Sequence, residues 1–439
     1  MNNTYLKGNN ESSSSHLYSY DDEDNEENED EKSKLKLICF FIFVFFIVII
    51  FLLLVLIIIY YFIIKPEKMN RRKRNPANYL SYIDRQKIEK YLDDLMNGIL
   101  PKQKIYSKVE NPKISIIIPV YNKQQYITRV LRSIQNQSFK DIEIVFCDDH
   151  SNDNSSILIE EYQKEDERIV LLKQEKNKGI LRNRIDGVKQ AKGEYILYID
   201  PDDLLLENIL NKLNSIVNST NIDILQFQGY IVDYSKSIYY LSDNQRSSEP
   251  IYQPKLSDLM YYENGYLHQT EFVIWGKLIK KKVFIKVINS LNEYYLNQNL
   301  SLHEDGLLLF LLFKKANSYI FIKDYGMLYI INENNTMSNL RRKDKINKTA
   351  RDCFLYLEFM IDYTNNTLHE KRMAFAQFKG LLYGFKDVYL RITNGYNYIF
   401  KVINKYLKCK IISEEEKKEI KQLKADLILA KQKMILKTK

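Results

Sequence analysis

Short apolar runs alternate with segments of helical spacing through the middle of this 439-residue chain. Five runs have the length of buried strands: 114–120, 142–147, 169–172, 195–199 and 222–227. Four other segments are typical of helices: 124–137, 153–162, 180–191 and 204–217. Strands that alternate with helices predict an α/β fold, in which helices cover both faces of a mostly parallel sheet.

Residues at the ends of these segments sharpen the prediction. Ser151 or Asp153 is a candidate N-cap for the second helix, because a side-chain oxygen there can accept from an unpaired backbone N–H. Gly193 follows the third helix and is expected to end it.

The alternation fades after residue 228, where Tyr-rich and Asn-rich segments follow. Apolar residues gather again at 272–279 (FVIWGKLI) and at 307–313. From about residue 343 the spacing predicts helices. The last of these, 414–434, is strongly charged and is expected to be solvated on much of its surface, with a coiled coil as the alternative.

A single run, 37–64, contains no charged residue and consists almost wholly of Ile, Leu, Phe and Val. About 20 such residues span a bilayer, so this run predicts one transmembrane helix. A cleaved signal peptide fits poorly, because the run is too long, lies behind a polar tail and has no small-residue cleavage site after it. Lys and Arg just after the run favour a cytoplasmic carboxyl side, although long domains are translocated against that bias.

The net charge of +9, from 65 basic and 56 acidic residues, is unevenly distributed. Residues 21–31 are mostly acidic and 65–74 mostly basic, and no basic face interleaved with aromatic residues follows. We therefore expect no nucleic-acid partner. The four cysteines have no spacing typical of a zinc site or a disulfide framework.

Carboxylates follow two of the predicted strands. Asp148 and Asp149 come after the second strand, and Asp200, Asp202 and Asp203 come after the fourth. Ligands of parallel sheets bind beyond the carboxyl ends of the strands, so the two clusters can converge on one site. Like charges this close are costly unless a cation lies among them. The alternative is that each cluster caps the helix after it.

Five motifs occur in one order: IPVYN at 118–122, DDHSND at 148–153, AKGEYILYIDPDD at 191–203, WGKL at 275–278 and HEDG at 303–306. Their order and spacing resemble the family 2 glycosyltransferases. The resemblance implies a Rossmann-like GT-A fold, a nucleotide-sugar donor, inversion at the transferred sugar and a divalent metal, Mn²⁺ or Mg²⁺. Oxygen ligands suit both ions.

The resemblance also implies roles for single residues. In the family's D-x-D spacing, Asp202 is expected to bind the metal, and Asp200 to face the ribose or metal-bound water. The nucleotide-sugar pocket is expected to include Pro119, Tyr121, Asn122, Asp148, Asp149, Gly179, Arg184 and Asp200. A carboxylate can accept the imide N–H of uracil, so the Asp pair favours a uridine donor.

The pattern departs from the family at Ile185, where an Asn often follows the Arg. This departure weakens the role carried over to Arg184, for which we weigh a phosphate contact, a contact to an acidic site residue and a surface ion pair.

Asp305 holds the family's position for the general base, and Glu304 is expected to orient the acceptor. The alternative for both is a favourable helix N-terminus, and the two interpretations are compatible. Trp275 either stacks on a sugar or belongs to the core.

No Gln-x-x-Arg-Trp motif occurs, and only one run is long enough to span a membrane. We therefore expect a membrane-anchored, non-processive, inverting enzyme that moves one sugar from a UDP-sugar to a hydroxyl of a glycan, glycoprotein or glycolipid. Membrane-tethered glycosyltransferases face a lumen, so we expect an endomembrane (Golgi or ER) location, with the side of the catalytic domain open. The alternatives are a catalytically inactive membrane-tethered protein that binds sugar nucleotides or glycans, and an interaction protein.

The expected organisation has five parts: a disordered acidic tail at 1–36, a transmembrane helix at 37–64, a basic juxtamembrane linker and helical stem at 65–112, the glycosyltransferase domain at 113–342 and a helical C-terminal region at 343–439.

Overall fold

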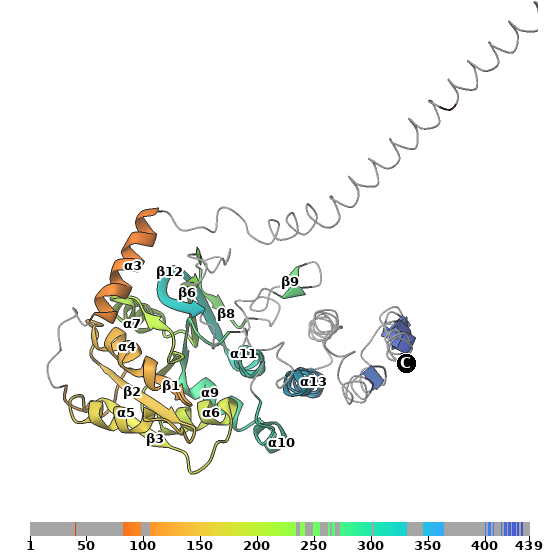
Figure 1. Ribbon diagram of the computed structural model, residues 1–439, viewed down its shortest axis with the longest axis horizontal. Coiled ribbons are helices and arrows are strands. Elements are labelled where there is room, and N and C mark those ends of the chain that lie inside the picture. The colour runs from red at the N-terminus through yellow and green to blue at the C-terminus, as the bar shows by residue number, and fades with distance from the viewer. Residues whose placement is uncertain are drawn as a thin grey trace, which may run out of the picture. The chain divides into compact units, whose positions relative to one another are not determined.

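The computed structural model of the protein (Figure 1) describes residues 82–97, 106–233, 238–241, 249–254, 262–263, 266–267, 273–300, 303–331 and 346–363, with Phe40 and scattered positions from 400 to 432. The chain divides into two units, Met1–Ala77 and Asn78–Lys439. Apart from Phe40, the predicted acidic tail and transmembrane helix lie outside the described residues. Within the described part of the chain, no helix has the length and hydropathy needed to cross a bilayer.

Among the described residues, ten strands form one sheet whose main path runs β3-β2-β1-β4-β11-β6-β12-β5. In that order the strands are β3 (Ile169–Lys173), β2 (Ile142–Asp148), β1 (Ile114–Val120), β4 (Tyr195–Tyr198), β11 (Lys277–Lys280), β6 (Ile224–Asp233), β12 (Ser318–Ile331) and β5 (Leu204–Leu205). Two strands lie off this path: β7 (Ile238–Leu241) pairs with β6, and β8 (Ile251–Tyr252) pairs with β12. A separate two-stranded sheet joins β9 (Tyr262–Glu263) and β10 (Tyr266–Leu267).

The first four strands, β3, β2, β1 and β4, are parallel, as the alternation predicts. Ile114 pairs with Ile142 on one side and with Tyr195 on the other, so the two strands that end in carboxylates flank β1. Both β1 and β2 are buried along their whole length, which explains their unbroken apolar sequences.

The second half of the sheet is mixed, so the expectation of a mostly parallel sheet holds only for the first half. β11 runs antiparallel to both β4 and β6, whereas β12 is parallel to β6. Parallel strands need a crossover connection, usually helical. The β6 strand is instead followed by the antiparallel strand β7, so the chain reverses without a crossover before it returns as β11.

The predicted helix at 204–217 is wrong at its start. Leu204 and Leu205 form the short strand β5, which pairs with Leu328 and Met327 of β12. The helix α7 (Ile209–Thr220) begins only after Asn208, whose φ of 59° is left-handed. Both leucines are fully buried, so pairing with a distant strand overrides the local helical pattern.

The other helices in the described regions are α3 (Tyr82–Met96), α4 (Gln124–Gln135), α5 (Ser155–Gln163), α6 (Ile180–Gln190), α9 (Lys281–Ile288), α10 (Glu293–Leu296), α11 (Glu304–Lys315) and α13 (Ile346–Tyr363). The predicted caps are wrong in detail. Ser151 does not cap α5, whose N-cap position is Asn154. The other candidate cap of α5, Asp153, does accept the Ser155 N–H at 3.0 Å through its carboxylate. At the end of α6, the last helical residue is Gln190, so the helix ends before Gly193.

Helices cover both faces of the sheet, as predicted. Ile117 and Val145 face a core that also contains Leu181 of α6 and Phe284 of α9. The alternate residues of the same strands face a second core shared with α4 and α7. This alternation follows from the two-residue period of a strand.

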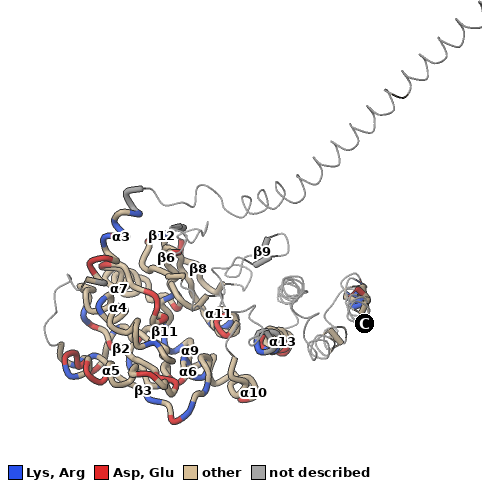
Figure 2. Tube along the Cα trace, in the orientation of Figure 1, with Lys and Arg blue, Asp and Glu red and all other residues tan. Residues whose placement is uncertain are grey.

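Figure 2, in the orientation of Figure 1, shows both basic and acidic stretches scattered over the described part of the chain. Helix α13 packs against α11, and Cys353 and Phe354 extend the core between them. Much of the predicted helical region 343–439 lies outside the described residues. Among its later positions, Ile403 and Ile420 are helical and buried.

Candidate active site

The carboxyl ends of β1, β2 and β4 lie side by side. Val120, the last residue of β1, is in register with Asp148, and its carbonyl accepts the Asp149 N–H at 2.8 Å. Beyond β4, the Ile199 N–H bonds to the Ile117 carbonyl at 3.1 Å. The two acidic clusters therefore lie at one edge of the sheet, where a parallel sheet binds its ligands.

Asp148 organises the turn between β2 and α5. One carboxylate oxygen accepts the Ser151 N–H at 3.1 Å and the Ser151 hydroxyl. The other accepts the hydroxyl of Ser156. Asp148 is buried, and hydrogen bonds from these neutral donors stabilise its carboxylate.

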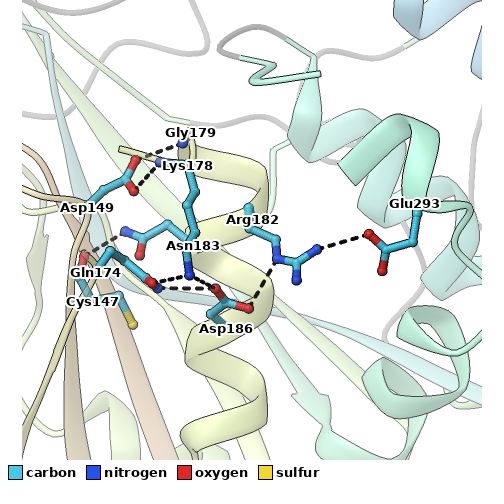
Figure 3. A network of polar contacts seen from close by, with 9 residues as sticks. All are labelled: Cys147, Asp149, Gln174, Lys178, Gly179, Arg182, Asn183, Asp186 and Glu293. Carbon is cyan, nitrogen blue, oxygen red and sulfur yellow. Dashed lines mark hydrogen bonds and ion pairs between the residues drawn. The ribbon is translucent and has the colours of Figure 1, made fainter. Parts of the chain in front are cut away.

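Asp149 organises a different loop, the one between β3 and α6 (Figure 3). Its two oxygens accept the backbone N–H groups of Lys178 at 2.7 Å and of Gly179 at 2.9 Å. Burial raises the pKa of Asp149, and the two backbone bonds oppose that rise. Gly179 has a φ of 84°, and a Cβ there would collide with the Asn299 side chain. The position therefore requires glycine.

An ion-pair network follows along α6 (Figure 3). The Asp186 carboxylate lies between the Lys178 ammonium and the Arg182 Nε, each at 3.4 Å. Arg182 also reaches Glu293 of α10 at 3.4 Å. Glu293 is 71% exposed at its side chain, so its pair with Arg182 is a surface contact of small energetic value.

Arg184 is the centre of a second, buried group of charges. Its Nη2 donates to Asp200 at 3.0 Å, and its Nη1 donates to Glu304 at 3.0 Å and also to Asp305. The four residues, called here the Arg184 cluster, come from α6, the end of β4 and the start of α11. The Arg184 side chain is 2% exposed, which rules out the surface ion pair that the sequence left open.

One guanidinium faces three carboxylates in the Arg184 cluster, and burial together with this excess of negative charge raises the pKa values of Glu304 and Asp305. Burial and the nearby Asp305 raise the pKa of Glu304 to about 7. Burial also raises the pKa of Asp305, while Arg184 opposes the rise. The cluster can therefore hold a proton near neutral pH, as acid–base chemistry requires.

Glu304 and Asp305 are also the first residues of α11, where the helix dipole favours negative charge. Both interpretations made from the sequence are therefore compatible with the structure. The second oxygen of Asp305 accepts the Ile274 N–H at 3.2 Å. His303 before them has a left-handed φ of 64°, and burial lowers its pKa to about 4.

The three carboxylates after β4 have different partners. Asp203 is buried and accepts the Ile330 N–H at 2.9 Å, and burial holds its pKa well above the usual range. Asp202 pairs with the Lys123 ammonium at 3.1 Å, and its main-chain carbonyl accepts from Arg129 at 3.0 Å. Basic side chains of the protein therefore lie among these carboxylates.

Within the described residues, no group of three or more His, Cys, Asp or Glu side chains is arranged as a metal site. An ion that is held together with a diphosphate needs only one or two carboxylates, because phosphate and water oxygens complete its shell. Asp200 and Asp202 satisfy that requirement, with side chains 34% and 12% exposed at the sheet edge. The donor set present fits Mg²⁺ or Mn²⁺.

The loop after β1 contains the other predicted pocket residues. Pro119 lies inside β1, and Tyr121 is 45% exposed. Asn122 has a φ of 52°, and its side-chain oxygen accepts the Asn152 N–H at 2.7 Å. A cavity of about 450 Å³ opens beside this loop and is lined by Asn122, Gln124, Gln125, Thr128, Asp153 and Leu158.

Trp275 lies in the core. It is 8% exposed and stacks on Tyr329, with ring centroids 5.8 Å apart and planes 19° apart. Of the two roles weighed from the sequence, its position matches the core role, and sugar stacking stays a prediction.

Sequence reasoning missed two basic residues. Lys123 and Arg129 both contact Asp202, which lies 79 and 73 positions further along the chain. The available signal was position: Lys123 directly follows the IPVYN motif, and Arg129 lies on the helix after it.

Comparison with known proteins identifies the same region. The model of the family described as glycosyl transferase family 2 matches residues 115–287. A GalNAc(5)-diNAcBac-PP-undecaprenol beta-1,3-glucosyltransferase of Campylobacter jejuni is 41% identical over 103 residues, which are 23% of this chain and 33% of that protein. A cholesterol galactosyltransferase of Borreliella burgdorferi is 26% identical over 318 residues, 70% of this chain and 83% of that protein.

A solved structure, S. aureus TarS 1-349 in complex with UDP-GlcNAc, aligns with a TM-score of 0.49 and 19% identity, over 69% of this chain and 82% of that one. The match to residues 115–287 ends before Glu304 and Asp305, so their roles rest on motif order and geometry. On the motifs, the family model and the relatives, residues 115–287 form a glycosyl transferase family 2 domain.

Proposed function

We propose that the protein is a membrane-anchored, non-processive, inverting glycosyltransferase that moves one sugar from a UDP-sugar to an acceptor hydroxyl. The observation that carries the proposal is the Arg184 cluster. Asp200 at the end of β4 and the Glu304–Asp305 pair at the start of α11 meet on one buried guanidinium. Asp200, which would face the donor, and Asp305, which would act as the base, therefore contact the same side chain.

Asp305 acts as the general base in this proposal. The acceptor oxygen attacks the anomeric carbon on the face opposite the diphosphate, the acceptor proton passes to the Asp305 carboxylate, and the bond from the sugar to the diphosphate breaks. Arg184 and the Ile274 N–H hold the two carboxylate oxygens, so the side chain has a fixed orientation. Such preorganisation is a large part of enzymatic rate enhancement.

Glu304 orients the acceptor in this proposal. With its pKa raised to about 7, it retains a proton over part of the neutral range, whereas Asp305 pairs with Arg184 as a carboxylate. A protonated carboxyl donates a hydrogen bond and can therefore position an acceptor oxygen next to the base.

Asp200 and Asp202 would hold the divalent ion, which when bound supplies positive charge to the departing diphosphate.

The uridine preference rests on the family resemblance of Asp148 and Asp149, whose carboxylates lie at the adjacent strand end. Sugar transfer is supported by the names of the relatives, a glucosyltransferase and a galactosyltransferase. The membrane anchor is proposed from residues 37–64.

The test uses the full-length chain. Calorimetric titrations with UDP, GDP, CDP and TDP are run in Mn²⁺ and again in EDTA, followed by transfer assays with UDP-glucose and UDP-galactose. We expect binding of UDP only, with a requirement for Mn²⁺. No binding of any nucleotide by a folded sample would contradict the proposal, and binding without transfer would favour the inactive binding protein.

A variant at the proposed metal ligand sharpens this test. Asp202→Asn removes a charge from the donor set and should lower metal-dependent transfer by about 10²-fold or more, because metal ligation supplies several kcal/mol to such reactions. Asp324→Asn, which alters an exposed carboxylate paired with Lys212 at 3.5 Å, is the matched control. Equal transfer by both variants would remove Asp202 from the site.

A further inference from the structure

Lys123 has no part in the roles proposed above, although its main chain is firmly held at the sheet edge. Its N–H donates to the Ser155 hydroxyl at 3.1 Å. The residue before it, Asn122, donates its own N–H to the Ser151 hydroxyl at 2.9 Å. The loop after β1 is thus fixed to the loop after β2, and the side chain is the part of Lys123 that is left to move.

The Lys123 side chain crosses the sheet edge to the end of β4. Its ammonium lies 3.1 Å from the Asp202 carboxylate and 5.1 Å from the centre of the Tyr126 ring. The two partners are 25% and 12% exposed at their side chains, so a ligand can reach the pair. An ammonium on a four-carbon stem is a compact charge that reorients readily.

Arg129 provides an internal contrast. Its guanidinium donates to the main-chain carbonyl of Asp202 at 3.0 Å and therefore holds the turn itself. Lys123 contacts the carboxylate of the same residue, the group with which a divalent ion would bind. Of the two cations, Lys123 is the one whose contact a bound ion would disturb.

Building on the proposed function, we propose that Lys123 is an exchangeable counter-ion of Asp202 and a ligand of the donor diphosphate. Without donor, the ammonium neutralises Asp202. With donor and a divalent ion present, two cations on one carboxylate repel each other, and the ammonium moves to the adjacent diphosphate oxygens. Lys123 then adds positive charge where negative charge develops as the sugar–diphosphate bond breaks.

The test measures binding by the full-length chain in three calorimetric titrations: Mn²⁺ alone, UDP with Mn²⁺, and uridine, which has no phosphate. The variant Lys123→Met removes the charge and keeps most of the apolar stem, and Lys123→Arg keeps a charge. The matched control is Lys212→Met, at an exposed lysine paired with Asp324. Urea unfolding of each variant checks that the fold is retained.

For Lys123→Met we expect UDP with Mn²⁺ to bind about tenfold more weakly, because a charge-assisted contact to the diphosphate is lost. Mn²⁺ alone should bind roughly threefold more tightly, because a competing cation is gone. Uridine binding should not change, and Lys123→Arg should recover most of the UDP affinity.

Three outcomes overturn the inference, and they are distinguishable. If the wild-type chain binds UDP with Mn²⁺ and Lys123→Met binds it equally well, Lys123 is not a diphosphate ligand and the proposed function stands. If Lys123→Met weakens UDP without tightening Mn²⁺, the exchange at Asp202 is wrong. A folded wild-type chain that binds no nucleotide would overturn the proposed function and this inference together.

Discussion

Two groups of carboxylates lie at the same edge of the sheet, and they are stabilised by different partners. Asp148 and Asp149 accept from hydroxyls and backbone N–H groups within nearby loops. In the Arg184 cluster, three carboxylates from distant parts of the chain share one guanidinium. The backbone bonds to Asp149 fix a loop and oppose the rise in pKa that burial causes, whereas the neighbouring Asp305 adds to the rise that burial causes in Glu304.

This difference separates a structural role from a chemical one. The bonds to Asp149 fix the β3–α6 loop next to the strand end, which sets where Gly179 and α6 lie. The Arg184 cluster retains more negative than positive charge, so a proton can enter it near neutral pH. A role for Asp148 or Asp149 in base recognition stays a prediction.

Removing the guanidinium should have the largest effect. Arg184→Met leaves the buried Glu304 and the partly buried Asp200 and Asp305 without their cation, which should cost on the order of 3 kcal/mol of unfolding free energy at pH 7. Transfer should fall by about 10²-fold or more, because the base loses its fixed partner. Urea unfolding and a transfer assay measure the two effects.

Arg182→Met is the matched control, since Arg182 lies on the same helix, its partner Glu293 is exposed, and its other partner Asp186 keeps the Lys178 ammonium. It should change stability by less than about 0.5 kcal/mol. If both variants lose the same stability, the comparison between a buried cluster and a surface network is wrong.

Replacing Asp149 should have a smaller and mainly structural effect. In Asp149→Asn one backbone N–H, of Lys178 or Gly179, faces an amide NH₂ in place of an acceptor. An unsatisfied buried donor costs about 1–3 kcal/mol, measurable as a lower urea midpoint. Unchanged stability would mean that this loop does not depend on the carboxylate.

The smallest effect should be a change in pH dependence. The pKa of Glu304 is raised to about 7 in the folded state from an ordinary value of 4.5. Between those values the folded state binds more protons than the unfolded state, so the Glu304 contribution lowers stability as pH rises.

Glu304→Gln removes this contribution. The variant should therefore gain stability relative to wild type between pH 5 and pH 7.5, by on the order of 1 kcal/mol in urea unfolding. The exposed Glu293→Gln variant should show no such gain. A difference between wild type and Glu304→Gln that does not vary with pH would show that Glu304 titrates normally.

The first half of the sheet could be predicted because its information is local. β1, β2, β3 and β4 are short apolar runs, and each ends next to charged or turn residues that limit it. The parallel direction of these strands follows from the helices that connect them. Leu204 and Leu205 show the limit of this logic, because only the distant strand β12 makes them a strand.

The site was predicted in its members more than in its contacts. Motif order singled out Asp200, Glu304 and Asp305, which the structure brings together on Arg184. A contact of Arg184 to an acidic site residue was one of three possibilities, and a separation of 121 positions from Asp305 gives no pattern that selects it. The partner of Asp202 was also hidden, because the Lys123 side chain crosses between two strand ends. Such contacts depend on tertiary packing, and one sequence does not encode them in a readable spacing.

The most direct test of the central claim is the Asp305→Asn variant of the full-length chain, with UDP binding and sugar transfer measured on the same sample. The side chain keeps its size and can still contact Arg184, but it no longer accepts a proton. We expect unchanged UDP affinity in Mn²⁺ and a loss of transfer by about 10²–10⁴-fold, the usual contribution of a general base. Full transfer by a variant that binds UDP normally would show that the Arg184 cluster does not hold the base.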